Sequence, residues 1–253
     1  MIVVVAGLFG LLVGSFLNVV IHRVPLHQSV VWPASRCPAC GAPIAALDNV
    51  PLLSYALLGG RCRNCKARIS ARYPLVEGLT GALFAAAAYE FGLDLRLLSA
   101  LVLISTLIAL GGIDLEHRLL PNAIVGPAAV VGLALSILES PERWWVYPIS
   151  AFAVAGGLLA LAISYPGGMG MGDVKMGGML GAFLGPYAAL AVFLGAFGGA
   201  ITGGLLIASG RIERRHALPF GVFMALGGIL TLFVGPQLWR LYLDLVGGAS
   251  GLP

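Results

Sequence analysis

The chain has 253 residues, of which 59% are hydrophobic and only 10% are charged, and its mean hydropathy is +0.96. Soluble domains carry about 25% charged residues, so this composition excludes an ordinary water-soluble protein. The net charge of +4 is not a nucleic-acid signature, and the distribution of charge between loops is more informative than its sum.

Apolar runs that approach the length of a membrane crossing follow one another along the chain. A spanning helix needs roughly 20 apolar residues. We therefore predict an all-α, polytopic membrane protein of about eight transmembrane helices, in which the sixth run is short and Gly-rich and forms a partial span. After Gly235-Pro236, the stretch 237–246 is expected to lie at the membrane interface. The eight predicted runs are Ile2–Ile21, Leu75–Phe91, Leu97–Ile113, Ala123–Leu138, Trp144–Tyr165, Val174–Leu184, Tyr187–Ser209 and Leu218–Val234.

The basic residues predict the orientation of these runs. If the N-terminus is outside, all but three of the 15 Lys and Arg residues fall on the inner side, the exceptions being Arg96, Arg143 and Arg240. The first run has no basic segment before it and no cleavage site after it, so we interpret it as a permanent anchor. This arrangement predicts three parts: an anchor over 1–21, a cytoplasmic loop over 22–74 and a transmembrane domain over 75–253.

The polar loop over 22–74 holds all four cysteines, as two C-x-x-C pairs with 21 residues between them. This spacing is typical of a Cys₄ zinc site, in which each pair closes a small knuckle around one tetrahedral ion. Disulfides or a redox pair are the alternatives, but the predicted cytoplasmic location favours reduced thiols. We therefore predict structural zinc, which would let a loop with little core fold. The ligands would be Cys37, Cys40, Cys62 and Cys65.

Polar residues also lie near the ends of the first two runs. Asn18 lies near the boundary of the first run, where an interhelical hydrogen bond is the ordinary use of a buried amide. Glu77 falls about one turn inside the second run, near Arg72 and Tyr73, and either pairs with one of them or caps the helix.

Two aspartates follow apolar or Gly-rich segments and are predicted to lie at the same face of the membrane. Asp114 is the first charge after the third run, and Asp173 follows the flexible stretch G-M-G-M-G that begins at Gly168. Each has an ordinary alternative: Asp173 would cap a helix, and Asp114 would reach the interface from a helix end. The helix macrodipole disfavours an acid at that end, so Asp114 is the less expected of the two. The Pro and Gly of Leu218–Gly221 would bring the backbone of the last run close to both acids.

If these carboxylates meet, they can cleave a peptide bond without a nucleophilic side chain. Repulsion leaves one carboxyl protonated and the other ionised, as in aspartic proteases. The ionised member then takes a proton from water, and the protonated member polarises the peptide carbonyl.

These motifs, in this order, resemble those of the type IV prepilin peptidases, bacterial inner-membrane aspartic proteases of the G-x-G-D type. The resemblance covers nearly the whole chain, although Asn122 stands where the family usually has an acid. Its motifs are G-S-F-L-N-V-V-I-H-R-V-P at Gly14–Pro25, the paired C-x-x-C loop, R-Y-P-L-V-E-G-L-T at Arg72–Thr80, Asp114 and G-x-G-D-x-K at Gly170–Lys175.

The resemblance implies an enzyme that removes the basic leader of prepilins and pseudopilins after a glycine and then N-methylates the new terminus with S-adenosylmethionine. It implies Asp114 and Asp173 as the catalytic pair and the four cysteines as a structural zinc site. We expect Gly170, Gly172 and Lys175 to contact substrate, the glycines leaving room for an extended backbone.

Further expectations concern methyl transfer, partners and competing functions. Asn18, Arg72 and Glu77 are candidate residues for binding the methyl donor, and the expected partners are prepilin substrates and the lipid bilayer, with no nucleic acid. Three alternatives remain open: a transporter that uses the two aspartates to carry protons or cations, a zinc-stabilised scaffold without activity, and a peptidase that cleaves without methylating.

Overall fold

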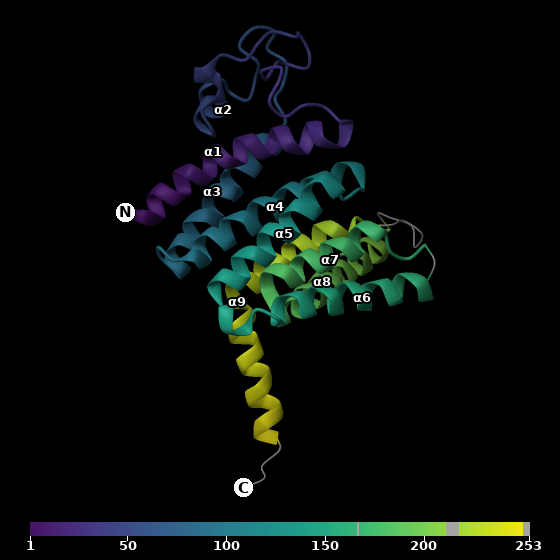
Figure 1. Ribbon diagram of the computed structural model, residues 1–253. Helices are drawn as coiled ribbons and strands as arrows, with labels where there is room; N and C mark the ends of the chain where they lie inside the picture. The colour runs from purple at the N-terminus through teal and green to yellow at the C-terminus, as the bar shows by residue number, and fades with distance from the viewer. Residues whose placement is uncertain (166, 211–217, 250–253) are drawn as a thin grey trace. The chain divides into compact units, whose positions relative to one another are not determined.

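The computed structural model describes residues 1–165, 167–210 and 218–249. Within these ranges every regular element is a helix, and the only strand-like pairings are two isolated bridges. The α-helices, drawn in Figure 1, are α1 (Ile2–Arg23), α2 (Leu53–Leu57), α3 (Arg72–Phe91), α4 (Leu95–His117), α5 (Asn122–Glu139), α6 (Val146–Ser164), α7 (Met171–Leu184), α8 (Ala188–Ala208) and α9 (Phe220–Ala249). Short 3₁₀ turns are η1 (Val24–Leu26), η2 (Ala46–Asn49), η3 (Pro141–Arg143) and η4 (Gly185–Tyr187).

The chain divides into two compact units, an N-terminal unit (Met1–Ala109) and a C-terminal unit (Leu110–Pro253). The division falls inside α4, so Asp114 belongs to the C-terminal unit. Each unit is described by itself.

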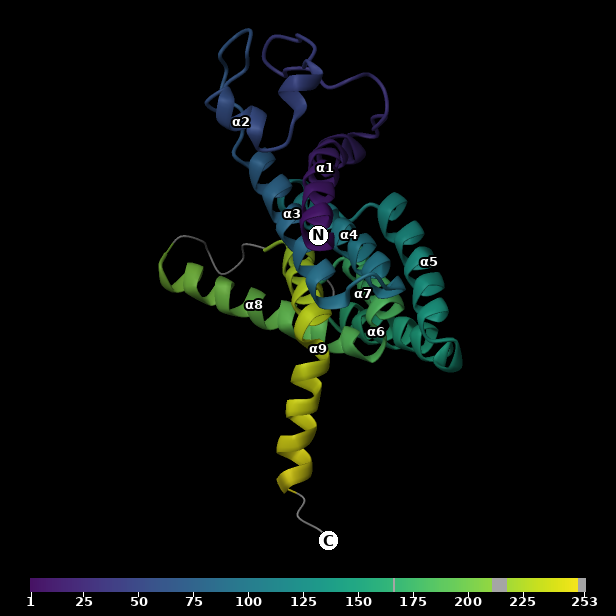
Figure 2. The same cartoon turned by 90° about the vertical axis from the view of Figure 1, so that its left-hand side faces the viewer.

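Helices α1 and α3 lie side by side in the N-terminal unit (Figures 1 and 2). Their approach is close because glycines face the contact: a Cβ at Gly10 would lie 2.8 Å from the Phe84 Cβ, and one at Gly14 would lie 2.7 Å from the Glu77 Cα. Small residues at helix contacts are common in membranes, where packing rather than hydrophobicity drives association. The amide of Asn18, 1% exposed, donates to the Tyr73 carbonyl at 3.1 Å, so the interhelical hydrogen bond expected for Asn18 is present.

In the C-terminal unit, α7 packs against α5 and α6, and α8 packs against α9. Met176, Met179 and Leu180 of α7 are fully buried. Glycines again set the closest approach: a Cβ at Gly227 of α9 would collide with the Ala191 carbonyl oxygen of α8, and one at Gly195 would lie 2.7 Å from the Phe223 carbonyl oxygen. The C-terminal half of α9 projects beyond the other helices of its unit (Figure 1).

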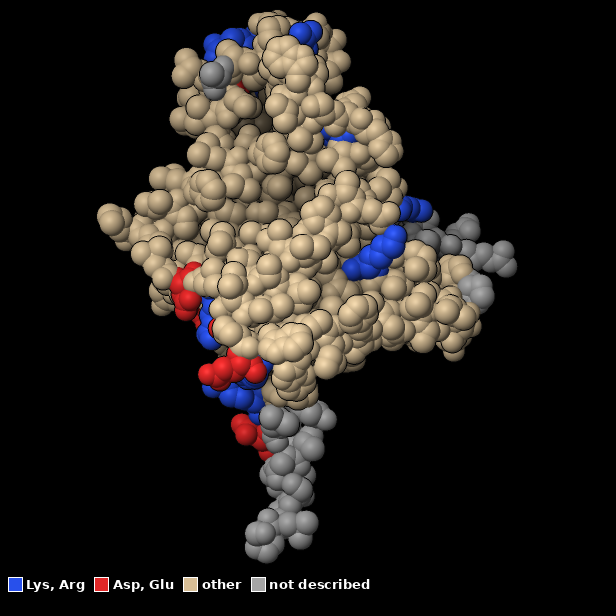
Figure 3. Space-filling model, in the orientation of Figure 1, with Lys and Arg blue, Asp and Glu red and all other residues tan. Residues whose placement is uncertain are grey.

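Six stretches of the described residues are long and apolar enough to cross a membrane, and the eight predicted spans are not confirmed. Two expected spans account for the difference. Helix α3 carries charged residues in its first two turns and near its end, and α7 has 14 residues, about 21 Å, against a hydrocarbon core of about 30 Å. The stretch Met171–Ala208, which contains both α7 and α8, counts as one of the six. Few charged side chains interrupt the surface of the long helices on the face drawn in Figure 3, as lipid contact requires.

Helix α9 is longer than the sequence predicts. The expected span ends at Val234 before Gly235-Pro236, yet the helix continues through Pro236 to Ala249. A proline removes one backbone hydrogen bond but does not oblige a helix to end, and membrane helices tolerate it well.

Candidate active site and cysteine centre

Asp173 lies in the first turn of α7, where the Gly-rich segment becomes helical. The backbone N–H of Gly170, the residue that precedes the helix, donates to Asp173 Oδ2 at 3.1 Å. The helix cap foreseen for Asp173 is therefore present. The side chain is half-buried, which makes it accessible to a reacting group as well as a cap.

Asp114 lies in the last turns of α4 and is only 6% exposed. Its Oδ2 accepts a hydrogen bond from the backbone N–H of Val222, at the start of α9, at 3.1 Å. A Cβ at the neighbouring Gly221 would lie 2.8 Å from the same oxygen, so only glycine leaves room for the carboxylate there. This contact confirms the expectation that Leu218–Gly221 brings the last helix to the aspartate site.

The segments that present the two aspartates come together within the C-terminal unit. The side chain of Leu120 lies between the two segments that present them: its atoms would be 3.0 Å from a Cβ at Gly172 and 3.0 Å from a Cβ at Gly221. Residues from three helices thus meet at one end of the unit.

The residues expected to contact substrate have neighbours of their own. Lys175 Nζ donates to Asn122 Oδ1 at 2.9 Å, which joins α7 to the first residue of α5. The space beside Gly172 is taken by Leu120, whereas the nearest neighbour of a Cβ at Gly170 would be Asp173 Oδ2 at 3.3 Å. Leu120, Asn122 and Val222 were not predicted to belong to the site, and the Leu-Pro-Asn run after Asp114 was the available signal for the first two.

The four cysteine sulfurs lie within 4.8 Å of one another, and none forms a disulfide. The Cys37 and Cys65 sulfurs, one from each pair, are 3.8 Å apart. Four sulfurs placed tetrahedrally at about 2.3 Å from one zinc ion would be about 3.8 Å apart, so the observed cluster fits that ion. A four-cysteine centre that can hold a metal is therefore present, as the spacing predicted.

The two C-x-x-C segments fold in the same way. In each, the first cysteine N–H donates to the carbonyl five residues later, and its own carbonyl accepts from the residue after the second cysteine (Cys37 with Ala42 and Gly41, Cys62 with Ala67 and Lys66). That following residue has a positive φ in both knuckles, 70° at Gly41 and 59° at Lys66. Arg63 Nε donates to Asp48 Oδ2 at 2.8 Å and fastens η2 to the second knuckle.

Local hydrogen bonds prepare one thiol for metal binding. Backbone N–H groups of Cys40 and Ala39 lower the pKa of Cys37 to about 6, so this thiol is largely a thiolate at neutral pH, the form that binds metal. A backbone hydrogen bond at Ala42 lowers the pKa of Cys40, but hydrogen bonds with the neighbouring thiols Cys37 and Cys65 outweigh it and raise that pKa to about 11. Zinc would reverse this preference by stabilising every thiolate.

The candidate residues for methyl-donor binding hold the N-terminal unit together. Glu77, 8% exposed, accepts a hydrogen bond at Oε2 from the backbone N–H of Leu52 at 2.9 Å, a partner that the sequence did not indicate. Leu52 has φ +59°, a conformation in which a non-glycine residue needs such support. The Arg72 guanidinium lies 5.1 Å from the centroid of the Tyr73 ring.

Membrane-length helices, a four-cysteine centre and two aspartates at the ends of helices place the chain among the polytopic membrane proteins. The chain is a member of the type IV leader peptidase family, which residues 101–234 match, and residues 8–91 match the bacterial peptidase A24 N-terminal domain. No solved structure matches the chain significantly.

Three relatives, each named prepilin leader peptidase/N-methyltransferase, illustrate the similarity. The protein from Bacillus subtilis is 34% identical over 95% of this chain and 98% of its own length, and that from Pseudomonas aeruginosa is 35% identical over 95% and 93%. The protein from Myxococcus xanthus is 46% identical over 81% of this chain, which spans 64% of that relative's length.

Proposed function

We propose that this protein is a membrane-embedded aspartic endopeptidase that removes the leader of prepilins and pseudopilins and N-methylates the new terminus. The observation that carries the peptidase proposal is that Leu120 lies against both Gly172, beside Asp173, and Gly221, which contacts the Asp114 carboxylate. Support for the substrate class and for methylation comes from the names of relatives that match most of the chain.

The two aspartates have the chemistry that peptide hydrolysis needs. One carboxylate removes a proton from water, the oxygen of that water adds to the carbonyl carbon, and the protonated carboxyl donates to the carbonyl oxygen. The C–N bond then breaks, and the amine leaves with a proton from the pair. Asp114 would be held for this task by the Val222 N–H, and Asp173 by the Gly170 N–H. Gly170, Gly172 and Lys175 would flank the bound peptide.

Methyl transfer requires the freed amine to attack a carbon activated as a sulfonium methyl. S-adenosylmethionine would supply that methyl group when bound, and the protein's part would be to hold the amine in its unprotonated form. We assign this activity to the loop over 22–74, with Asn18, Arg72 and Glu77 at its border. Zinc on the four cysteines would stabilise the fold of the loop rather than take part in chemistry.

We also propose an orientation, with the N-terminus outside and both sites at the cytoplasmic face of the inner membrane. Its support is the charge distribution, which leaves Arg96, Arg143 and Arg240 as the only Lys or Arg residues on the outer side. A prepilin has a basic leader before an apolar helix, so its scissile bond would lie at the same depth. A transporter is less favoured because the matching relatives carry peptidase names.

The test is cleavage of a prepilin peptide, followed by mass spectrometry that reports leader loss and N-methylation together. Asp114→Asn and Asp173→Asn should each abolish cleavage, whereas Asp244→Asn, at an exposed acid of the same unit, should cleave normally. Either active-site variant cleaving at the wild-type rate would refute the assignment. Cleavage without methylation by the wild-type protein would favour the peptidase that has lost methyl transfer.

A further inference from the structure

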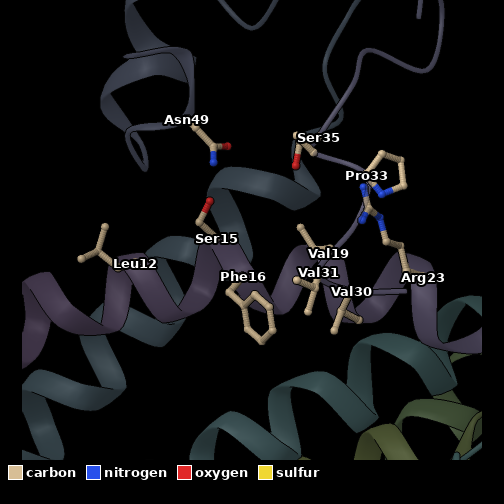
Figure 4. A pocket seen from close by; sticks show the side chains of 11 residues that line it. Leu12, Ser15, Phe16, Val19, Arg23, Val30, Val31, Pro33, Ser35 and Asn49 are labelled. Carbon is tan, nitrogen blue, oxygen red and sulfur yellow. The ribbon is translucent and has the colours of Figure 1, made fainter. Parts of the chain in front are cut away.

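A groove of about 280 Å³ runs along α1 in the N-terminal unit and is roofed by the segment 30–35 that leads into the first knuckle (Figure 4). It reaches from Leu12 to Arg23, eleven residues along the helix, or about 16 Å. None of the individual residues that were given a role above lines this groove.

The groove continues an apolar stripe on the membrane-spanning part of α1. Val5, Leu8, Leu12 and Phe16 recur at helical spacing, and each is at least half exposed. The stripe is open where α1 crosses the membrane and is roofed only toward its C-terminal end. An occupant can therefore extend from the groove directly into the hydrocarbon region, which a water-soluble ligand has no reason to do.

The other end of the groove is cationic. Of the described residues that line it, Arg23 is the only charged one, so nothing acidic opposes an anion there. The Arg23 Nη1 donates to the Ser29 carbonyl at 3.0 Å, which fixes the side chain, and a guanidinium has five N–H donors in all. Between the ends, the side chains of Ser15, Ser35 and Asn49 face one another across the groove (Figure 4).

We propose that this groove binds an acidic phospholipid of the surrounding membrane. Its phosphate contacts the Arg23 guanidinium, its glycerol and ester oxygens lie beside Ser15, Ser35 and Asn49, and one acyl chain follows the stripe through Leu12. The length agrees, because about 16 Å is close to one leaflet of a hydrocarbon core about 30 Å thick. Since Ser35 lies two residues before Cys37, the bound lipid would form part of the support that holds the first knuckle to α1.

The experiment offers the full-length protein equal amounts of phosphatidylglycerol and phosphatidylcholine in mixed micelles and counts the lipids it retains by native mass spectrometry. The wild type should prefer phosphatidylglycerol by about fivefold, the contribution of one basic residue at an anionic surface. Arg23→Gln should remove this preference and Arg23→Lys should keep it. Arg96→Gln, the same change at an exposed arginine at the start of α4, should leave it unchanged.

Because Arg23→Gln also removes a contact to Ser29, Ser15→Phe provides an independent variant that fills the groove and keeps Arg23. It should lower retention of phosphatidylglycerol to the level of phosphatidylcholine. The proposal is overturned if the wild type shows no preference for phosphatidylglycerol or if Arg23→Gln or Ser15→Phe keeps that preference. It is also overturned if the protein retains as much free glycerol phosphate as phosphatidylglycerol. Absence of retained lipid, with a photoactivatable group at position 12 crosslinking prepilin instead, would assign the groove to the substrate.

Discussion

Gly221 is the position where the smallest change to the chain should disturb the aspartate pair. In Gly221→Ala the new Cβ would meet Asp114 Oδ2 at 2.8 Å and the Leu120 Cδ2 at 3.0 Å. Ordinary contact begins at 3.4 Å, so the carboxylate must move by 0.6 Å or the start of α9 must retreat. Either movement weakens the 3.1 Å hydrogen bond from the Val222 N–H.

The size of the effect follows from that hydrogen bond. A hydrogen bond to a charged group contributes about 1.5–3 kcal/mol, and its loss in the transition state corresponds to about a 10- to 100-fold slower reaction. Displacement of a catalytic group by about 1 Å has effects of similar size. We therefore expect Gly221→Ala to cleave a prepilin peptide about 10- to 100-fold more slowly while the protein remains folded.

The assay is single-turnover cleavage in one membrane mimic, followed by mass spectrometry, with thermal unfolding measured in parallel. Gly204→Ala in α8 is the matched control, because a Cβ there meets nothing within 4 Å. It should cleave like the wild type and be slightly more stable, as helix alanine usually is. If Gly221→Ala cleaves within about twofold of the wild type, the position of Asp114 does not limit the reaction and our reasoning is wrong.

Three further predictions test the metal centre, the N-terminal unit and the site border. Metal analysis of purified protein should find one zinc per chain and little in Cys62→Ser; full zinc content in that variant would remove the cysteine site. Glu77→Ala should leave the Leu52 N–H without its acceptor, lower the free energy of unfolding by about 1–3 kcal/mol in denaturant and slow methyl transfer. Glu77→Gln keeps an acceptor and should behave like the wild type. If both variants lose the same amount of stability and activity, the charge of Glu77 itself is needed. Asn122→Asp would turn the Lys175 hydrogen bond into an exposed ion pair worth at most about 1 kcal/mol, so the cleavage rate should change little. A large loss of cleavage rate would mean that this pair takes part in the chemistry.

The sequence predicted those features that depend on spacing within a short segment. The C-x-x-C pairs imply their knuckles because each pair closes its own turn, and the Leu-Pro-Phe-Gly run at 218–221 marked the backbone that approaches Asp114. The all-helical class followed from the lengths of the apolar runs. The catalytic roles of Asp114 and Asp173 are still predictions, supported by the meeting of their two segments at Leu120.

Features that depend on tertiary contacts were beyond the reach of the sequence. Nothing in the run around Glu77 indicates that its carboxylate accepts a hydrogen bond from the backbone of Leu52, 25 residues earlier. Likewise, Lys175 meets Asn122 only because α7 packs against α5. The eight predicted spans are not confirmed, because length and hydropathy alone do not show whether a helix as short as α7 crosses the bilayer.

The glycines between α8 and α9 bear on any attempt to make this protein more heat-tolerant. Replacing helix glycines by alanine is a common way to raise a melting temperature. At Gly195 and Gly227 the added methyl would collide with backbone atoms of the facing helix and push α9, together with the amide that steadies Asp114, away from its neighbour. Such a programme should begin at Gly126, Gly156 and Gly204, where the methyl meets open space.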